Sequence, residues 1–288
     1  MKTILALIRQ PRESDSFIQY LIDLARELGA GIHLLNVENP VNYPLGTSDL
    51  TGVAVANLQK SLDRKVMEAK EVLSHHVNSL NKDHTQEVPV QVSAKVGNEV
   101  TLIGQMVKEK KADMVALEYN QMSGFWQKDN VIRDLIRTIK CPVWVIPEGS
   151  SFTGMDHIVY ATDYHEADVS TLKRLINLTR PLTPEIEALH ITDHTDFSEK
   201  VRQKGFQEIL ETKTGYKQIS LRTLVEHSGQ DVTELVNSYA SRTNTDLIVV
   251  LKENKNFLER IFRPSSSERM VEEANKPILV FHEQHRDG

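Results

Sequence analysis

Residues 97–101 read GNEVT and residues 229–233 read GQDVT, so one short motif occurs twice in the chain. Two more matched pairs follow in the same order: ADMVAL (112–117) with TDLIVV (245–250), and CPVWVIPE (141–148) with KPILVFHE (276–283). The offsets are 132, 133 and 135 residues, so the halves differ only by small loop insertions. Ordered matches of this kind indicate a tandem duplication.

Each half alternates short apolar strands with amphipathic helices. TILALI (3–8) and HIVYA (157–161) open the halves and are almost wholly apolar, as strands buried on both faces are. Strands separated by helices run parallel with right-handed crossovers. VPVQV (88–92) contains Pro89, which cannot donate a ladder hydrogen bond, so we expect this strand at a sheet edge. The predicted fold is α/β, with two repeated doubly wound units that carry helices on both faces.

The repeat also predicts the domain boundaries. We expect one domain over residues 1–148, a linker over residues 149–156 and a second domain over residues 157–288. The linker lies in the Gly/Ser-rich stretch PEGSSFTGMD. The last strands, PVWVI (142–146) and PILVF (277–281), would leave hydrophobic edges, so we expect them to cover each other within the chain.

Composition excludes several classes of protein. The 288 residues are 40% hydrophobic and 26% charged, which is ordinary for a globular protein. The net charge is −6, with no basic excess for nucleic acid. Cys141 is the single cysteine, which excludes an intrachain disulfide and a Cys-based zinc site. No stretch approaches the roughly 20 apolar residues of a membrane span. We therefore expect a cytoplasmic protein.

Two stretches resemble a known family. SSSERMVEEANKPILV (265–280) and IVYATDYHEAD (158–168) are similar to the last helix and strand, and to the first strand, of universal stress proteins. In the first half the resemblance rests on VIRDLIRTIKCPVWVIP (131–147) and on the repeat. It implies two units paired about a pseudo-twofold axis, each with a five-stranded parallel sheet in the order 3-2-1-4-5. Ligands of such sheets bind beyond the strand C-termini, at the switch point between strands 1 and 4.

The resemblance implies a nucleotide site in the second half. Family members that bind ATP use an Asp after the first strand, a glycine loop that cradles the phosphates, and a Ser or Thr. Asp163 and Ser265 match this pattern, but the glycine positions hold Leu251, Asn254 and Pro264. Pro264 lacks an N–H for phosphate, so we expect ATP to bind weakly or not at all. The candidate ligand pocket comprises Thr162, Asp163, Ile191, Ser265 and Ser266.

The corresponding site of the first half is further from the family pattern. Arg9 occupies the position of the Asp, and Asp129 stands where the last glycine would be. An Asp at that position repels phosphate and is better interpreted as a helix N-cap. Neither half is therefore expected to hold a cofactor.

The remaining candidate chemistry is sparse. His190 and His194 are four residues apart, a spacing that suits zinc on a helix but not on a strand. We expect His190 to be a core histidine and predict no metal site. The histidines of the pairs His75–His76 and His282–His285 are expected to be solvated. The chain has no nucleophile elbow, Walker-type loop or HExxH motif, and we predict no catalytic residue.

These observations predict a non-enzymatic, cytoplasmic stress-response or regulatory protein. It would act through an unidentified protein partner or a small-molecule ligand, with a homodimer left open. The alternative is an adenine-nucleotide switch in the second domain, with slow ATP turnover. An enzyme on a related scaffold, such as an ATP pyrophosphatase, would need a Ser-Gly-Gly-x-Asp-Ser loop after its first strand. The chain has IRQPRES and TDYHEAD there.

Overall fold

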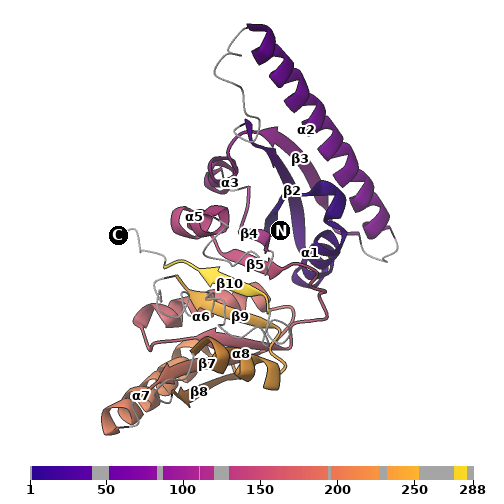
Figure 1. Ribbon diagram of the computed structural model, residues 1–288. Helices are drawn as coiled ribbons and strands as arrows, with labels where there is room; N and C mark the ends of the chain where they lie inside the picture. The colour runs from indigo at the N-terminus through magenta and orange to yellow at the C-terminus, as the bar shows by residue number, and fades with distance from the viewer. Residues whose placement is uncertain are drawn as a thin grey trace. The chain divides into compact units, whose positions relative to one another are not determined.

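The computed structural model describes residues 2–40, 52–82, 87–109, 111–119, 130–193, 196–226, 232–252 and 276–283. By its packing the chain forms two compact units. Unit 1 comprises Met1–Glu118, Arg137–Cys141 and Glu148–Phe152, and unit 2 comprises Tyr119–Ile136, Pro142–Pro147 and Thr153–Gly288. Figure 1 labels the helices and strands of both units. The domain boundaries expected at residues 148 and 157 remain predictions.

Unit 1 is a parallel sheet with helices on both faces. Its strands run in the order β3-β2-β1-β4, and each neighbouring pair is parallel. Helices α1 and α2 contact each other and β2, whereas α3 lies on the other side of the sheet (Figure 1). The elements are β1 (Lys2–Ile8), η1 (Pro11–Glu13), α1 (Asp15–Leu28), β2 (Ala30–Glu38), α2 (Gly52–Asn81), β3 (Val90–Val96), α3 (Glu99–Lys108) and β4 (Met114–Tyr119).

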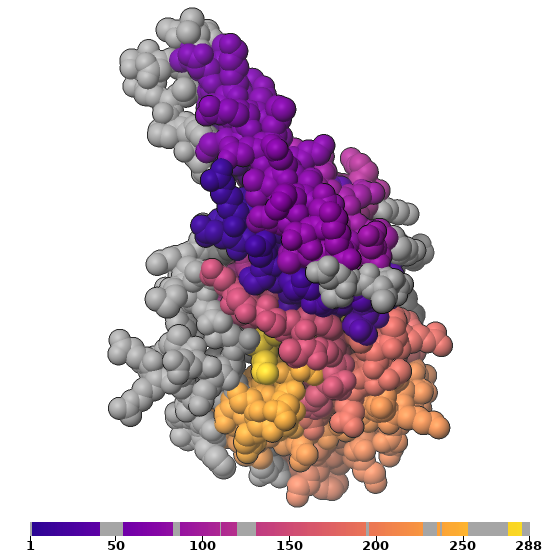
Figure 2. All heavy atoms as spheres, turned by 90° about the vertical axis from the view of Figure 1, so that its right-hand side faces the viewer, coloured from indigo at the N-terminus to yellow at the C-terminus, as the bar shows by residue number. Residues whose placement is uncertain are grey.

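Hydrophobic periodicity accounts for the core of unit 1. Five consecutive residues of β1, from Ile4 to Ile8, are buried, as a strand covered on both faces requires. Helix α1 buries one face and ends at Gly29, which adopts φ 61° and so can follow a helix in the left-handed region. Helix α2 is longer than the face it covers and forms a ridge on unit 1 (Figure 2).

The predicted edge strand lies at the edge. β3 is the terminal strand of unit 1 and begins at Val90, directly after Pro89. Pro89 cannot donate to the ladder, but its carbonyl accepts a hydrogen bond of 2.9 Å from the backbone N–H of Ile32. The expected strand over 88–92 therefore starts two residues later and runs to Val96.

Unit 2 has the same layered arrangement, with six strands in its sheet. Its strands run in the order β8-β7-β6-β9-β10-β5, parallel except for the last pair. The elements are α5 (Asn130–Thr138), β5 (Val143–Pro147), β6 (His157–Ala161), α6 (Glu166–Thr179), β7 (Glu185–Thr192), α7 (Phe197–Thr214), β8 (Ile219–Val225), α8 (Val232–Arg242), β9 (Leu247–Leu251) and β10 (Ile278–Phe281).

The last strands of the two repeats pair with each other, as expected. β5 and β10 are antiparallel, with Leu279 opposite Trp144, and both side chains are fully buried. His282, which follows β10, is also buried, so the prediction of a solvated His282 is wrong. Its Nε2 lies 2.7 Å from the carbonyl oxygen of Ile136, to which a protonated ring nitrogen can donate. This neighbour is 146 residues away in the chain, so local sequence gives no sign of it.

The fold class is confirmed. In unit 2 the order β8-β7-β6-β9-β10 is the predicted 3-2-1-4-5, and unit 1 has the first four positions of the same order. Among the described residues, none of the helices is both long and apolar enough to cross a membrane.

Candidate functional site

The expected pocket of the second half begins where β6 ends. Thr162 is the first residue after β6, and its side chain is only 2% exposed. Its hydroxyl donates to Asp168 at 2.7 Å and accepts from the backbone N–H of Tyr164 at 3.0 Å. Thr162 therefore shapes the turn after β6, and its hydroxyl already has two partners within the chain.

Asp168 is the centre of this network. It lies in the first turn of α6, is 2% exposed, and accepts from the hydroxyls of Tyr160 and Thr162, each at 2.7 Å, and from the backbone N–H of His165 at 3.0 Å. Burial raises the pKa of the Asp168 carboxyl, and the three donors oppose that rise. A buried carboxylate with three donors joins β6 to α6 and stabilises the site.

The side chain of Tyr164 packs against residues of β7 and β8. Its backbone adopts φ 60°, a left-handed conformation that is uncommon for a bulky residue. Its ring lies 4.1 Å from the ring of His190 and 5.1 Å from that of Phe206, and its hydroxyl is 3.1 Å from that of Thr223. Arg202 covers the same ring at 5.6 Å. Burial raises the pKa of Tyr164.

His190 is a core histidine, as predicted. It is 6% exposed, and its Nδ1 donates to the carbonyl of Thr162 at 2.7 Å. Its Nε2 lies 3.4 Å from a carboxylate oxygen of Glu199, whose side chain is 9% exposed. The imidazole thus ties β7 to the end of β6 and lies beside a buried carboxylate on α7. His194 lies outside the described residues.

The predicted pocket residues do not all converge. Asp163 is accessible: its side chain is 58% exposed and lies 3.7 Å from Nδ1 of His190. Alternate residues of a strand face opposite sides. His190 faces α7, so Ile191 faces the side on which Leu189 packs against Tyr239 of α8. Thr162 and Asp163 are neighbours in the turn after β6, Ile191 is on the face of β7 toward α8, and Ser265 and Ser266 lie outside the described residues.

The matching position of unit 1 is built differently. Arg9 follows β1 where Asp163 follows β6, and its Nε lies 3.6 Å from a carboxylate oxygen of Glu99 in the first turn of α3. Asn36 of β2 donates from Nδ2 to the carbonyl of Ile8 at 2.8 Å, in the place of the His190 contact. Asp129 and its expected capping role lie outside the described residues.

Two carboxyl groups of unit 1 lie near each other. Glu118 lies at the end of β4, and Glu148 follows β5. Burial, with the nearby charge of Glu148, raises the pKa of Glu118 to about 7, while a hydrogen bond from the backbone of Gly149 acts in the opposite sense.

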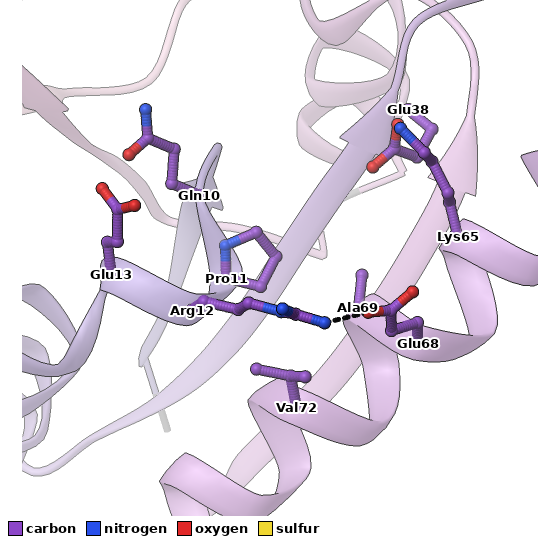
Figure 3. Close-up of a pocket in the computed structure, with 9 residues that line it drawn as sticks. All are labelled: Gln10, Pro11, Arg12, Glu13, Glu38, Lys65, Glu68, Ala69 and Val72. Carbon is purple, nitrogen blue, oxygen red and sulfur yellow. Dashed lines mark hydrogen bonds and ion pairs between the residues drawn. The ribbon is translucent and has the colours of Figure 1, made fainter.

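Unit 1 also has an open pocket of about 280 Å³, which we did not predict (Figure 3). Pro11, Ala69 and Val72 give it apolar surface, and Arg12 reaches across it to an ion pair with Glu68. Its rim carries opposite charges, with Glu38 and Lys65 side by side in Figure 3. Its volume is at the lower end for a ligand site. The pocket could not be predicted from sequence, because its lining residues come from η1, β2 and α2, which lie far apart in the chain.

Of the pair on α2, His75 is exposed as predicted, whereas His76 differs from expectation. His76 is not solvated: its Nδ1 lies 2.6 Å from a carboxylate oxygen of Asp15, and its side chain is 18% exposed. This contact joins α2 to the start of α1. Among the described residues, the His, Cys, Asp and Glu side chains form no group of three or more that could hold a metal ion.

Both units are doubly wound α/β sheets with polar side chains at the carboxyl ends of their strands. Proteins of this class bind their ligands beyond those strand ends. The family model for universal stress proteins matches residues 1–147 and 154–282. The chain therefore belongs to the universal stress protein family, in a tandem form.

Individual relatives agree with this assignment. The chain is 26% identical over 136 residues to the universal stress protein MJ0531 of Methanocaldococcus jannaschii, covering 43% of this chain and 79% of that protein. A crystal structure of a universal stress protein from Archaeoglobus fulgidus aligns with a TM-score of 0.64 at 14% identity, covering 99% of this chain and 97% of that one. The cytoplasmic domain of a prokaryotic cation chloride cotransporter aligns at 0.50 and 11% identity, over 97% and 94% of the two chains. These structures share the fold.

Proposed function

We propose that the chain is a non-enzymatic, cytoplasmic regulatory protein of the stress response, with degenerate nucleotide sites, that acts through protein contacts. The observation that carries this proposal is the closed network at the end of β6. The hydroxyl of Thr162 and the carboxylate of Asp168 are buried and hydrogen-bonded within the chain. Polar groups that already have partners offer little to a nucleotide.

The charges of unit 1 support the same proposal. Arg9 replaces the acidic residue after the first strand and contacts Glu99. Glu148 follows β5 and lies near Glu118, whose pKa is raised to about 7. A triphosphate would have to approach these carboxylates, which costs electrostatic energy.

An adenine-nucleotide switch in the second domain is the second candidate. Asp163 favours it, because this carboxylate follows the first strand and remains 58% exposed. A different small ligand is the third candidate, and the pocket of unit 1 favours it.

Mass spectrometry of the small molecules released from denatured, purified protein separates these candidates. We expect no adenine nucleotide near one equivalent per chain. A stoichiometric nucleotide that is absent from Asp163→Ala, but retained by Asp63→Ala on α2, would overturn the proposal. A different molecule, lost from Arg12→Ala and retained by Asp163→Ala, would place a ligand in the pocket of unit 1.

A further inference from the structure

In unit 2 an aromatic cluster lies between the end of β6 and helix α7. The ring of Tyr164 is 4.1 Å from the ring of His190 and 5.1 Å from that of Phe206. The guanidinium of Arg202 is 5.6 Å from the centre of the Tyr164 ring, which is a cation–π contact. Three rings and a cation thus pack together at this place.

The repeat identifies the matching positions in the strands of unit 1. Asn36 corresponds to His190, since both donate to the carbonyl at the end of the first strand. Two residues beyond that carbonyl, Gln10 corresponds to Tyr164. Gln10 adopts φ −123° and ψ 84°, whereas Tyr164 adopts φ 60°. Figure 3 shows the side chain of Gln10 directed away from Glu38 of β2, so it does not cover β2 as the Tyr164 ring covers β7.

The burial pattern aligns helix α2 with helix α7. Each helix has three buried residues spaced by seven and then four positions, namely Leu62, Ala69 and Leu73 in α2, and Glu199, Phe206 and Leu210 in α7. Ala69 therefore stands where unit 2 has Phe206. Lys65 stands where unit 2 has Arg202. Unit 1 thus lacks both the tyrosine and the phenylalanine ring but keeps a cation.

The open pocket of unit 1 lies where these rings are missing. Gln10, Lys65 and Ala69 all line it, and its volume is about 280 Å³ (Figure 3). Pockets for drug-sized ligands measure roughly 300–1,000 Å³, so this one suits a molecule with a single ring. Arg12 and Glu68 form an ion pair across it, but their side chains are 75% and 50% exposed. An exposed pair is weak and does not hold the pocket shut.

Carboxylates outnumber cations around the pocket. Glu13, Glu38 and Glu68 line it, against Arg12 and Lys65. A carboxylate accepts a hydrogen bond from a hydroxyl group but repels an anion. The lining therefore favours a neutral ligand with a hydroxyl group over an aromatic acid.

Asn36 supplies a further acceptor on the same face of β2. It is 1% exposed and lies two residues before Glu38, so the two side chains share a face of the strand. The Oδ1 atom of Asn36 is buried and has no hydrogen-bond partner among the residues that the structure describes. A buried acceptor without a donor is unfavourable, so a hydroxyl group that reached this atom would stabilise the site.

We propose that the pocket of unit 1 binds a small neutral phenol, whose ring takes the place that the Tyr164 ring occupies in unit 2. Ala69 leaves room for the ring, and the ammonium group of Lys65 contacts it as Arg202 contacts Tyr164. The hydroxyl group of the ligand donates to an acceptor of the pocket. The lining residues come from the turn after β1, from β2 and from α2, whereas the nucleotide position lies between β1 and β4. The proposal is therefore independent of whether a nucleotide binds.

Phenol itself is the probe, because it is the ring of a tyrosine side chain as a free molecule. Saturation-transfer difference NMR on the full chain, with phenol from about 0.1 to about 10 mM, measures its binding. We expect a dissociation constant of about 1 mM, as suits so small a ligand. Cyclohexanol has the same shape without a π face for the cation, and it should bind about threefold more weakly.

Ala69→Phe installs the residue of unit 2 and should weaken phenol binding at least tenfold, because the new ring fills the pocket. Ala56→Phe is the matched control, since it makes the same change at an exposed position of α2 outside the pocket. It should leave phenol binding unchanged, and thermal unfolding verifies that both variants fold. Lys65→Gln alters the pocket without filling it. It should weaken phenol binding about threefold and leave cyclohexanol binding unchanged.

Four results would overturn the proposal. The first is a wild type that does not bind phenol in this range, and the second is a folded Ala69→Phe variant that binds it as well as the wild type. The third is equal affinity for phenol and cyclohexanol, and the fourth is a Lys65→Gln variant that keeps the full preference for phenol. Titration with Mg-ATP is a separate measurement, so failure of this proposal is distinguishable from failure of the proposed function.

Discussion

At the end of its first strand, each repeat has the same hydrogen bond from a side chain of the second strand, but the side chains differ. In unit 1 the amide of Asn36 donates to the carbonyl of Ile8 at 2.8 Å, and in unit 2 the imidazole of His190 donates to the carbonyl of Thr162 at 2.7 Å. The register of each sheet places these donors at equivalent positions on the second strand. The contact between the strands belongs to the fold.

The side chains around that shared contact have diverged. Ile8 is apolar where Thr162 is hydroxylated, and Arg9 is cationic where Asp163 is anionic. The contact is common to both units, whereas the side chains beside it give the two strand ends different charge and polarity.

The largest expected difference concerns Asp168. Its counterpart in unit 1 is Ser14, which is also buried and whose hydroxyl donates to the carbonyl of Pro11. Asp168→Ala leaves three donors without their acceptor and should lower the free energy of unfolding by about 3 kcal/mol. Ser14→Ala should lower it by about 1 kcal/mol. Urea unfolding of both variants measures the difference, and equal losses would contradict the central role of Asp168.

Exchanging the cross-strand donors tests the shared contact. His190→Leu removes the donor to Thr162 and leaves Glu199 buried beside an apolar group, so we expect a loss of about 2 kcal/mol. His190→Asn installs the side chain that unit 1 uses and should lose about 1 kcal/mol. Thermal unfolding ranks the two variants. If asparagine proves no better than leucine, the two contacts are not equivalent.

The ends of the fourth strands also differ, because Glu118 stands where unit 2 has the buried Leu251. The pKa of Glu118 is raised from 4.5 to about 7, so the folded chain holds a proton that the unfolded chain releases between these values. Stability from this group is therefore lost as the pH rises through this window. Glu118→Gln should stabilise the protein above pH 7 and change little below pH 4.5.

Glu109→Gln is the matched control for that experiment. A hydrogen bond from Lys111, and its charge, lower the pKa of Glu109, so removal of this carboxylate should be slightly unfavourable at neutral pH. Denaturant unfolding at several pH values measures whether each of the two substitutions raises or lowers the free energy of unfolding. A pH-independent effect of Glu118→Gln would contradict the raised pKa.

The smallest effect is expected at Asp163. Its side chain is exposed and lies beside His190 without a hydrogen bond, so Asp163→Ala should change the free energy of unfolding by about 1 kcal/mol or less. A much larger loss, measured by chemical denaturation, would mean that Asp163 holds the fold together as Asp168 does.

Features that depend on neighbouring residues, or on a periodic pattern of apolar residues, could be predicted from the sequence. The repeat and the apolar runs led to the alternation of parallel strands and helices, and Pro89 placed β3 at an edge. The order of the strands in each sheet was implied by the resemblance to universal stress proteins. The same resemblance singled out Thr162 and Asp163. The burial of Thr162 could not be foreseen, because its partner Asp168 acts through the packing of α6 on β6.

The remaining features depend on contacts between distant segments. The ring of Tyr164 rests on His190 only because its backbone turns into the left-handed region after β6. His282 is buried against a residue of the other repeat, and the pocket of unit 1 forms among three separate elements. No pattern of apolar and polar residues encodes such neighbours.

Titration calorimetry with Mg-ATP tests the central claim, that polar groups at the end of β6 serve the fold and no longer a nucleotide. We expect a dissociation constant weaker than about 100 μM, which corresponds to less than roughly 5.5 kcal/mol of binding. The same weak binding should be found for wild type and Asp163→Ala. A clearly tighter constant that is lost in Asp163→Ala would contradict this account and establish a working nucleotide site in the second repeat.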